Sequence, residues 1–175
     1  QANKLLTADS DDEVRCELAR KIGRLVPGLE PNEATRIRDM AIEVMERLAR
    51  DSLPRVRAIL AEEIKSSTNV PAHIVKLLAQ DLEIVVCAPV LEYSPLLSDE
   101  DLIEIIASAR VEGSLAAIAR RSAVREKVSD AIVATLDVSA IASLLTNPSA
   151  QIREAALDRV VEHAEAIEAW HQPVV

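Results

Sequence analysis

One short pattern, Asp51-Ser52-Leu53-Pro54-Arg55-Val56-Arg57, occurs in this chain more than once. Its other clear copy starts 42 residues earlier and reads Asp9-Ser10-Asp11-Asp12-Glu13-Val14-Arg15. Aliphatic and small residues follow both copies at the same distances: Leu60, Ala61 and Ile64 in one, and Leu18, Ala19 and Ile22 in the other. A pattern that returns after the length of a helix pair is typical of repeat proteins.

Three further copies of the pattern are weaker. Asp81 starts one of them, in which Cys87 replaces the arginine, and Asn147 starts another. The aliphatic residues at the centres of the five copies are spaced by 42, 30, 42 and 24 residues: Val14, Val56, Val86, Val128 and Ile152. We expect each copy to belong to a helix pair that buries its apolar side against the next pair.

The residue types in the pattern predict specific contacts. An acid or amide in a turn can accept hydrogen bonds from the free backbone amides at the start of the next helix. The arginine six residues later can reach the acid of a neighbouring repeat. We therefore expect a ladder of ion pairs from Arg15 and Arg57 that is interrupted at Cys87. The central aliphatic residues should be buried: Val14, Val56 and Ile152.

Apolar residues recur at helical spacing along most of the chain. Three stripes are clear: Ile37, Met40, Ala41, Val44 and Leu48; Leu102, Ile105, Ile106 and Ala109; Ile152, Ala156, Val160, Val161 and Ala164. Breaks between helices are predicted at Pro27-Gly28-Leu29-Glu30-Pro31, Ser66–Asn69 and Ser94-Pro95. Starts are indicated by Asn32, Pro71, Ser98 with Asp101, Asp137 and Asn147-Pro148, and Pro89 predicts a kink or a start.

Composition excludes other fold classes. Aromatic residues make up only 1% of the 175 residues and there are three glycines, which argues against a sheet-rich fold and against phosphate-binding glycine loops. We predict an all-α protein, an α-α superhelix that forms a single helical-repeat domain over residues 1–175. Because the first residue is Gln1 and not Met, we expect the sequence to be a fragment of a longer chain.

Charge and cysteine content restrict the partners. The net charge is −9, which argues against nucleic-acid binding, and residues 88–175 carry −7 of it. The acidic stretch Glu92–Glu112 is either a solvated face or a docking surface for a basic partner. Two cysteines are too few for a disulfide framework, and no apolar run is long enough for a membrane helix. We expect a cytoplasmic protein.

The turn acid and the helix arginine resemble those of HEAT repeats. Asp9 with Arg15, Asp51 with Arg57, and Asn147 with Arg153 match that family's pattern. Three other stretches resemble a bacterial family, domain of unknown function 2336: Ala88–Ile103, Ala117-Ile118-Ala119-Arg120-Arg121 and Val128–Val133. This second resemblance runs roughly from Leu48 to Val175. It implies a repeat stack and a bacterial cytosolic origin, and it carries over no catalytic residue.

No residue is predicted to be catalytic, to bind a cofactor or to hold a metal. His163 and His171 lack the four-residue step that places two ligands on one metal ion. Cys16 and Cys87 have no base near them in sequence, and no serine lies in a nucleophile elbow. The basic cluster is short of aromatic residues and is diluted by acids: Arg120, Arg121, Arg125 and Lys127.

We therefore expect a non-enzymatic interaction or regulatory module with an unknown protein partner. A homodimer is one alternative for the partner. The alternative function is a HEAT-like enzyme, which would resemble either DNA-alkylation glycosylases or bilin lyases. A glycosylase of that kind needs a basic, aromatic-lined concave face, and a lyase needs a tetrapyrrole pocket. Neither feature is visible in the sequence.

Overall fold

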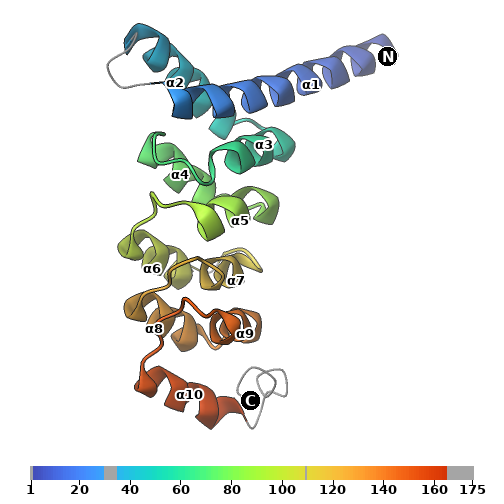
Figure 1. Ribbon diagram of the computed structural model, residues 1–175. Helices are drawn as coiled ribbons and strands as arrows, with labels where there is room; N and C mark the ends of the chain where they lie inside the picture. Colours follow the sequence, from blue (N-terminus) through green and yellow to red (C-terminus); the bar gives the residue numbers. More distant parts are fainter. Residues whose placement is uncertain (1, 30–34, 109, 165–175) are drawn as a thin grey trace. The chain divides into compact units, whose positions relative to one another are not determined.

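A computed structural model describes residues 2–29, 35–108 and 110–164 of the chain, with side chains from residue 11 onward (Figure 1). Within these residues the protein is all-α, as predicted, and contains no β-strand. The elements are α1 (Ala2–Leu25), η1 (Val26–Gly28), α2 (Thr35–Ala49), α3 (Pro54–Ile64), α4 (Ala72–Ala79), α5 (Ile84–Tyr93), α6 (Asp99–Ser108), α7 (Ser114–Ala119), α8 (Glu126–Thr135), α9 (Val138–Thr146) and α10 (Glu154–Ala164).

The helices form two compact units. Unit 1 comprises Gln1–Val90 and Ser94–Leu96, and unit 2 comprises Leu91–Tyr93 and Leu97–Val175. Helix α5 therefore contributes its last turn to unit 2. A single domain over residues 1–175 stays a prediction. None of the described helices combines the length and the apolar character needed to cross a membrane.

Unit 1 is built from helices that pack on their neighbours in the chain and on the next helix but one. Helix α1 packs along α3, and α2 packs on both α3 and α4 (Figure 1). The contact between α1 and α3 is close, because a Cβ placed on Gly23 would lie only 2.7 Å from the Cβ of Glu63. The core consists of aliphatic and small side chains, as the composition requires: Ala19, Met45, Val56, Leu60, Ala61, Ile64, Ile74, Leu78, Val86 and Val90.

Helix α1 differs from the prediction in two ways. It runs without a break from Ala2 to Leu25, so Asp9 lies within a helix and not in a turn. Val14 is 62% exposed, whereas its equivalent Val56 is fully buried. The reason is that α1 buries a different stripe, which contains Cys16, Ala19 and Gly23. The expectation that Val14 is buried was therefore wrong.

The turn residues of the repeat share one hydrogen-bonding pattern. The Oδ1 atom of Asp51 accepts from the amide of Leu53 at 2.9 Å, and Oδ1 of Asp81 accepts from the amide of Glu83 at 3.0 Å. In unit 2, Oδ1 of Asn147 accepts from Ser149 at 2.9 Å. Each side chain thus closes a local turn two residues ahead of it. The amides within the following helices are not their targets, which corrects the capping prediction.

The predicted ion-pair ladder is present in unit 1. Arg15 binds both carboxylate oxygens of Asp51 at 2.7 and 2.8 Å, and Arg57 binds those of Asp81 at 2.6 and 3.0 Å. Arg57 also donates to the backbone oxygen of Asp51 at 2.7 Å, so the Asp51 turn is bound both by Arg15 of the preceding copy and by the arginine of its own copy. The next register position holds the buried thiol of Cys87, where this series of arginines stops as predicted.

Unit 2 has a similar packing with different polar contacts. Helix α8 packs against α6 and α10, and α7 packs against α9 (Figure 1). All six residues of α7 are buried. Ile152 is only half-buried, although the repeat pattern predicts that this residue is buried. Arg153 pairs with Glu126 at 2.9 Å and with Asp130 at 3.0 Å, both from the α8 helix and not from a turn.

Several predicted helix ends are confirmed, but Asn147-Pro148 does not start a helix, because Asn147 is the C-cap residue of α9 and α10 begins at Glu154. Ser98 and Asp101 form the capping box, in which each backbone amide donates to the side chain of the other residue. Asp137 accepts from the amide of Ala140 at 2.7 Å and caps α9. Helix α5 ends at Tyr93, before Ser94-Pro95, and contains Pro89 in its interior, so no helix begins there. Asn32 and Ala109 lie outside the described residues.

Candidate interaction surface

The first turn of α5 and the two residues before it carry a cluster of large exposed apolar side chains. Leu82 is 69% exposed and Val85 is 59% exposed, and Ile84 between them is also exposed. We call these three residues the apolar edge. The three side chains lie within four consecutive residues, and exposure of apolar surface to water is unfavourable. They therefore mark a surface that another molecule can cover.

The equivalent turn of the preceding repeat shows how unusual this edge is. The two turns have the same side-chain hydrogen bond, from Asp51 in one and Asp81 in the other, so their positions can be matched. The matched positions hold polar or turn-forming residues before α3 and aliphatic residues before α5: Ser52, Pro54 and Arg55 against Leu82, Ile84 and Val85. The fold of the turn does not require aliphatic residues at these positions. Sequence reasoning missed the edge, although a comparison of the two copies contains the signal.

Charges beside the apolar edge are unevenly neutralised. Asp81 is held by Arg57, and the hydrogen bonds and charge of that guanidinium outweigh the effect of burial and lower the pKa of the carboxyl group. Glu83 lies within the edge, is exposed, and faces no cation that forms an ion pair with it among the described residues. The edge therefore combines apolar side chains with an open negative charge.

The acidic stretch Glu92–Glu112 is partly neutralised within unit 2. Glu92 pairs with Arg120 at 3.0 Å, and Asp99 pairs with Arg125 at 3.0 Å. Asp101 is used in the capping box. Two exposed carboxylates of α6, Glu100 and Glu104, form no ion pair with the part of the chain that the structure describes. A basic partner would therefore meet fewer open charges here than the sequence indicates.

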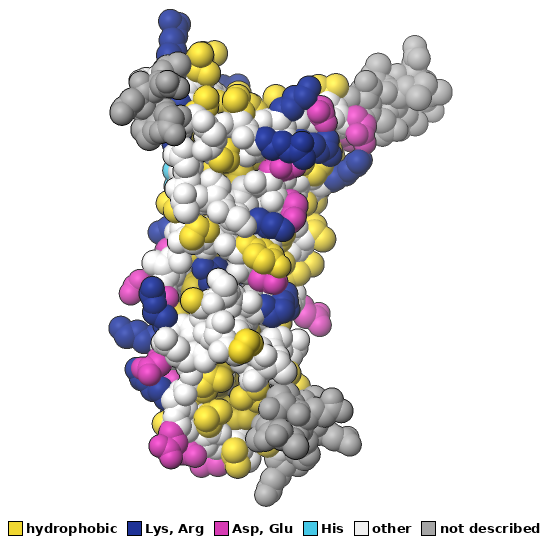
Figure 2. Space-filling model, viewed as in Figure 1, with side chains coloured by type: hydrophobic (Ala, Val, Ile, Leu, Met, Phe, Trp, Pro, Cys, Tyr) yellow, Lys and Arg dark blue, Asp and Glu magenta, His cyan; other side chains and the backbone are white. Residues whose placement is uncertain are grey.

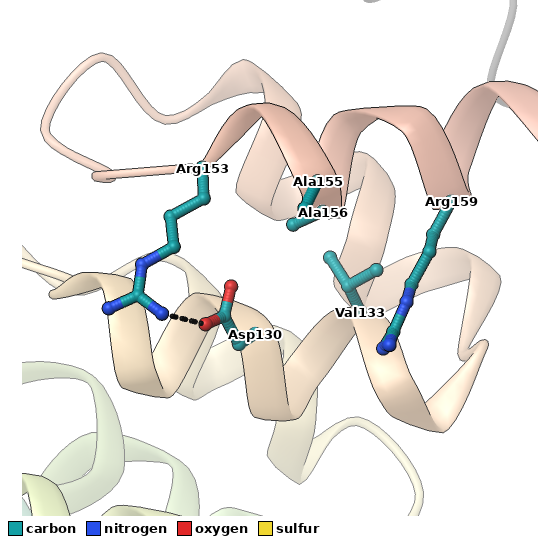
Figure 3. A pocket seen from close by; sticks show the side chains of 6 residues that line it. All are labelled: Asp130, Val133, Arg153, Ala155, Ala156 and Arg159. Carbon is teal, nitrogen blue, oxygen red and sulfur yellow. Dashed lines mark hydrogen bonds and ion pairs between the residues drawn. The ribbon is translucent and has the colours of Figure 1, made fainter.

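An open pocket of about 320 Å³ lies between α8 and α10 (Figure 3). Its floor is apolar, and an arginine stands at each end, Arg153 and Arg159. Arg153 points toward Asp130 and forms an ion pair with it, so that carboxylate is not a free base. The remaining lining residues are aliphatic: Val133, Ala155 and Ala156. None of the described residues that line the pocket supplies a nucleophile.

The other candidate groups have structural contacts. The thiols of Cys16 and Cys87 are buried, and burial together with the charge of Asp81 raises the pKa of Cys87 to about 11. His73 lies 2.6 Å from Glu46, and His163 donates to the Arg159 carbonyl oxygen at 2.9 Å. Among the described residues, no three metal-ligating side chains lie together. His171 lies outside the described residues.

Comparison with known families finds a match for the second half of the chain. The model of one family, described as an uncharacterised protein conserved in bacteria (DUF2336), matches residues 86–175. The chain belongs to this family. The match confirms the resemblance found in the sequence and leaves residues 48–85 outside it. No curated protein and no solved structure matches the chain.

Two of the segments that resemble DUF2336 contact each other in unit 2, Ala88–Ile103 and Ala117–Arg121. Arg120 pairs with Glu92, and Arg121 donates to the Leu91 carbonyl oxygen at 2.5 Å. The arginines that follow α7 thus hold the last turn of α5 in unit 2. With Arg125 bound to Asp99, three of the four cations in the predicted basic cluster are used inside the unit. The DUF2336 part of the chain therefore has no broad cationic track among these residues.

Proposed function

We propose that this chain is a non-enzymatic helical-repeat module that binds another protein, and that the partner contacts the apolar edge. The observation that carries the proposal is the change from Ser52, Pro54 and Arg55 in one turn to Leu82, Ile84 and Val85 in the next. Two turns with the same hydrogen bonds need no such difference for folding. Recognition of a partner accounts for it, because burial of apolar surface drives most protein association.

The repeat contacts support a HEAT-like stack as the scaffold of this module. The turn acids Asp51 and Asp81 bind arginines of the preceding helices, as the pattern of that family leads one to expect. Helical-repeat proteins use their extended surfaces to bind partners and vary those surfaces while their cores stay the same. We also propose a cytoplasmic location, which the two free buried thiols support because thiols stay reduced there.

The chemistry of the edge defines the partner segment. It should carry apolar side chains to cover Leu82 and Val85, and a lysine or arginine to meet Glu83. The net charge of −9 favours a basic segment further, because it attracts such a partner at long range. An amphipathic helix with a basic flank has both properties.

The test compares cross-linked partners in bacterial cells that express three forms of the protein. The wild type should capture a specific protein, and the double variant Leu82→Glu/Val85→Glu should lose it. Val161→Glu is the matched control, because Val161 is a 58% exposed valine on α10 in unit 2. The proposal fails if the edge variant captures the same proteins as the wild type and the control.

A separate pair of variants tests the acidic face of α6. Glu100→Lys and Glu104→Lys reverse open charges, whereas Glu92→Lys would also break the ion pair with Arg120. If the captured partner docks its basic flank on α6, the first two variants weaken its binding. Binding that stays unchanged removes α6 from the interface and leaves the apolar edge as the contact.

A further inference from the structure

Helix α1 is apolar on two opposite sides. One stripe is buried in unit 1 and consists of Cys16, Ala19 and Gly23. The other stripe consists of Val14, Leu18 and Leu25, which are 62%, 39% and 46% exposed. We call it the outer stripe. Surface helices of soluble proteins have one apolar stripe, and a helix that is apolar on both sides is normally covered on both.

The register of the repeat shows what kind of surface the outer stripe is. Val14 and Leu18 correspond to Val56 and Leu60 of α3, both of which are fully buried in unit 1. Their positions in α3 are used for helix packing. The outer stripe therefore has the residue types and the spacing of a surface that receives another helix. Figure 2 shows hydrophobic side chains along the upper edge of the view, where α1 and α2 lie.

Two charged residues beside the outer stripe indicate which charges a helix packed against it should carry. Asp11 and Lys21 lie at its two ends, each with a side chain that is 74% exposed. Both are held only loosely, by ion pairs of 3.9 Å to Arg15 and 3.7 Å to Glu17. Their charges are opposite, so the stripe has a negative end and a positive end.

Four of these residues lie symmetrically about residue 16, whereas Leu25 lies outside this symmetric set. Asp11 and Lys21 are equally far from residue 16, and so are Val14 and Leu18. An antiparallel copy of α1, related by a two-fold axis at this point, places Val14 opposite Leu18 of the partner subunit. The same axis places Asp11 opposite Lys21 of the partner subunit. A self-complementary surface of this kind is what a two-fold dimer requires.

We propose that the outer stripe of α1 is a homodimer contact, in which α1 packs antiparallel against α1 of a second copy. The contact joins apolar side chains at its centre and two ion pairs at its ends. It uses residues of α1 that the proposed partner surface does not include, so both contacts can form at once.

Light scattering over a wide concentration range tests the proposal. The wild type should change from dimer to monomer on dilution, and Leu18→Glu should be monomeric throughout with unchanged helical circular dichroism. Val161→Glu is the control: it places the same charge on an exposed valine of α10, outside both proposed contacts, and should leave the dimer intact. A wild type that is monomeric at every concentration overturns the proposal.

A charge swap tests the antiparallel arrangement. Lys21→Asp places two acids opposite each other at both ends of the contact and should weaken association several-fold at low salt. Asp11→Lys should do the same with two bases. The double variant Asp11→Lys/Lys21→Asp restores opposite charges and should recover the wild-type dissociation constant. If the double variant stays as weak as the single ones, α1 does not pair in this way.

Discussion

Arg121 donates from Nη1 to the carbonyl oxygen of Leu91 at 2.5 Å, across 30 residues of sequence. The reason lies four residues after Leu91, where Pro95 has no backbone hydrogen to donate. The carbonyl at the end of α5 would otherwise lack a partner from the chain that follows. Burial lowers the pKa of the Arg121 guanidinium, and the negative charge of Asp99 opposes this shift. The group that makes the contact therefore lies in surroundings that disfavour its charged form.

Replacing Arg121 should therefore leave the Leu91 carbonyl oxygen without a hydrogen-bond donor and lower stability. Arg121→Met should lower the free energy of unfolding by about 2 kcal/mol, because a carbonyl bound by a charged donor loses its partner. Pro95→Ala in the same chain restores an amide at position 95 and should recover part of this loss. Urea denaturation of the two single variants and the double variant measures the coupling between them. Strict additivity of the two effects would contradict the explanation.

The side chain of Asn147 both donates and accepts hydrogen bonds. Substitution by aspartate removes the donation and keeps the acceptor, so it tests the contribution of that donation to stability. The Nδ2 atom of Asn147 donates to the carbonyl oxygens of Ala119 and Arg121, both at 2.8 Å, while its Oδ1 closes the turn at Ser149. Asn147→Asp keeps the turn but places a charge against two carbonyl oxygens. It should destabilise at least as much as Asn147→Ala, by about 1–3 kcal/mol. Thermal unfolding decides: an aspartate variant as stable as the wild type would show that the donation is unimportant.

The lowered pKa of Asp81 predicts an acid limit of stability. An aspartate whose pKa is lower in the folded state stabilises the protein above the pKa of the unfolded chain, about 4. This contribution is lost as the pH falls through the folded value. Asp81→Asn should cost about 2 kcal/mol at pH 7, and the difference from the wild type should shrink below about pH 4.

Urea titrations at a series of pH values measure this difference. Asp39→Asn on the exposed side of α2 is the control and should change stability by less than about 0.5 kcal/mol at any pH. If the difference in the free energy of unfolding between Asp81→Asn and the wild type stays constant down to pH 2, the ion pair is not the source of that difference.

The raised pKa of Cys87 predicts a protected thiol. With a pKa of about 11, caused by burial and by the charge of Asp81, little thiolate exists at pH 8. Native protein should react with a disulfide reagent far more slowly than unfolded protein, and the rate should rise with urea. Ser52→Cys places an exposed thiol on the surface of unit 1 and should react at once. Fast labelling of native Cys87 would contradict its burial.

Sequence alone predicts the contacts that the repeat pattern encodes. The pairs Arg15–Asp51 and Arg57–Asp81 span 36 and 24 residues, and they are predicted from the place of each arginine and each turn acid in the repeat. The same reasoning fails at Asp9, because an acid alone does not stop a helix. Before α3 the chain has Pro54, which fixes the helix start, whereas Asp12 at the matched position lets α1 continue.

The candidate surfaces needed the structure, because exposure depends on what surrounds a residue. Val14 and Val56 have the same place in the pattern, yet only Val56 has helices on both sides. The exposure of Leu82 and Val85 likewise became visible only in the structure. The role of Arg121 depends on a contact 30 residues away, which no local pattern contains.

The turns closed by Asp51, Asp81 and Asn147 show how this chain can change over evolutionary time. The hydrogen bond that closes each turn lies within three residues, so gene duplication or deletion of a whole helix pair would leave this bond intact in every remaining turn. Shuffling of modules at these turns would let relatives differ in length without losing the ability to fold.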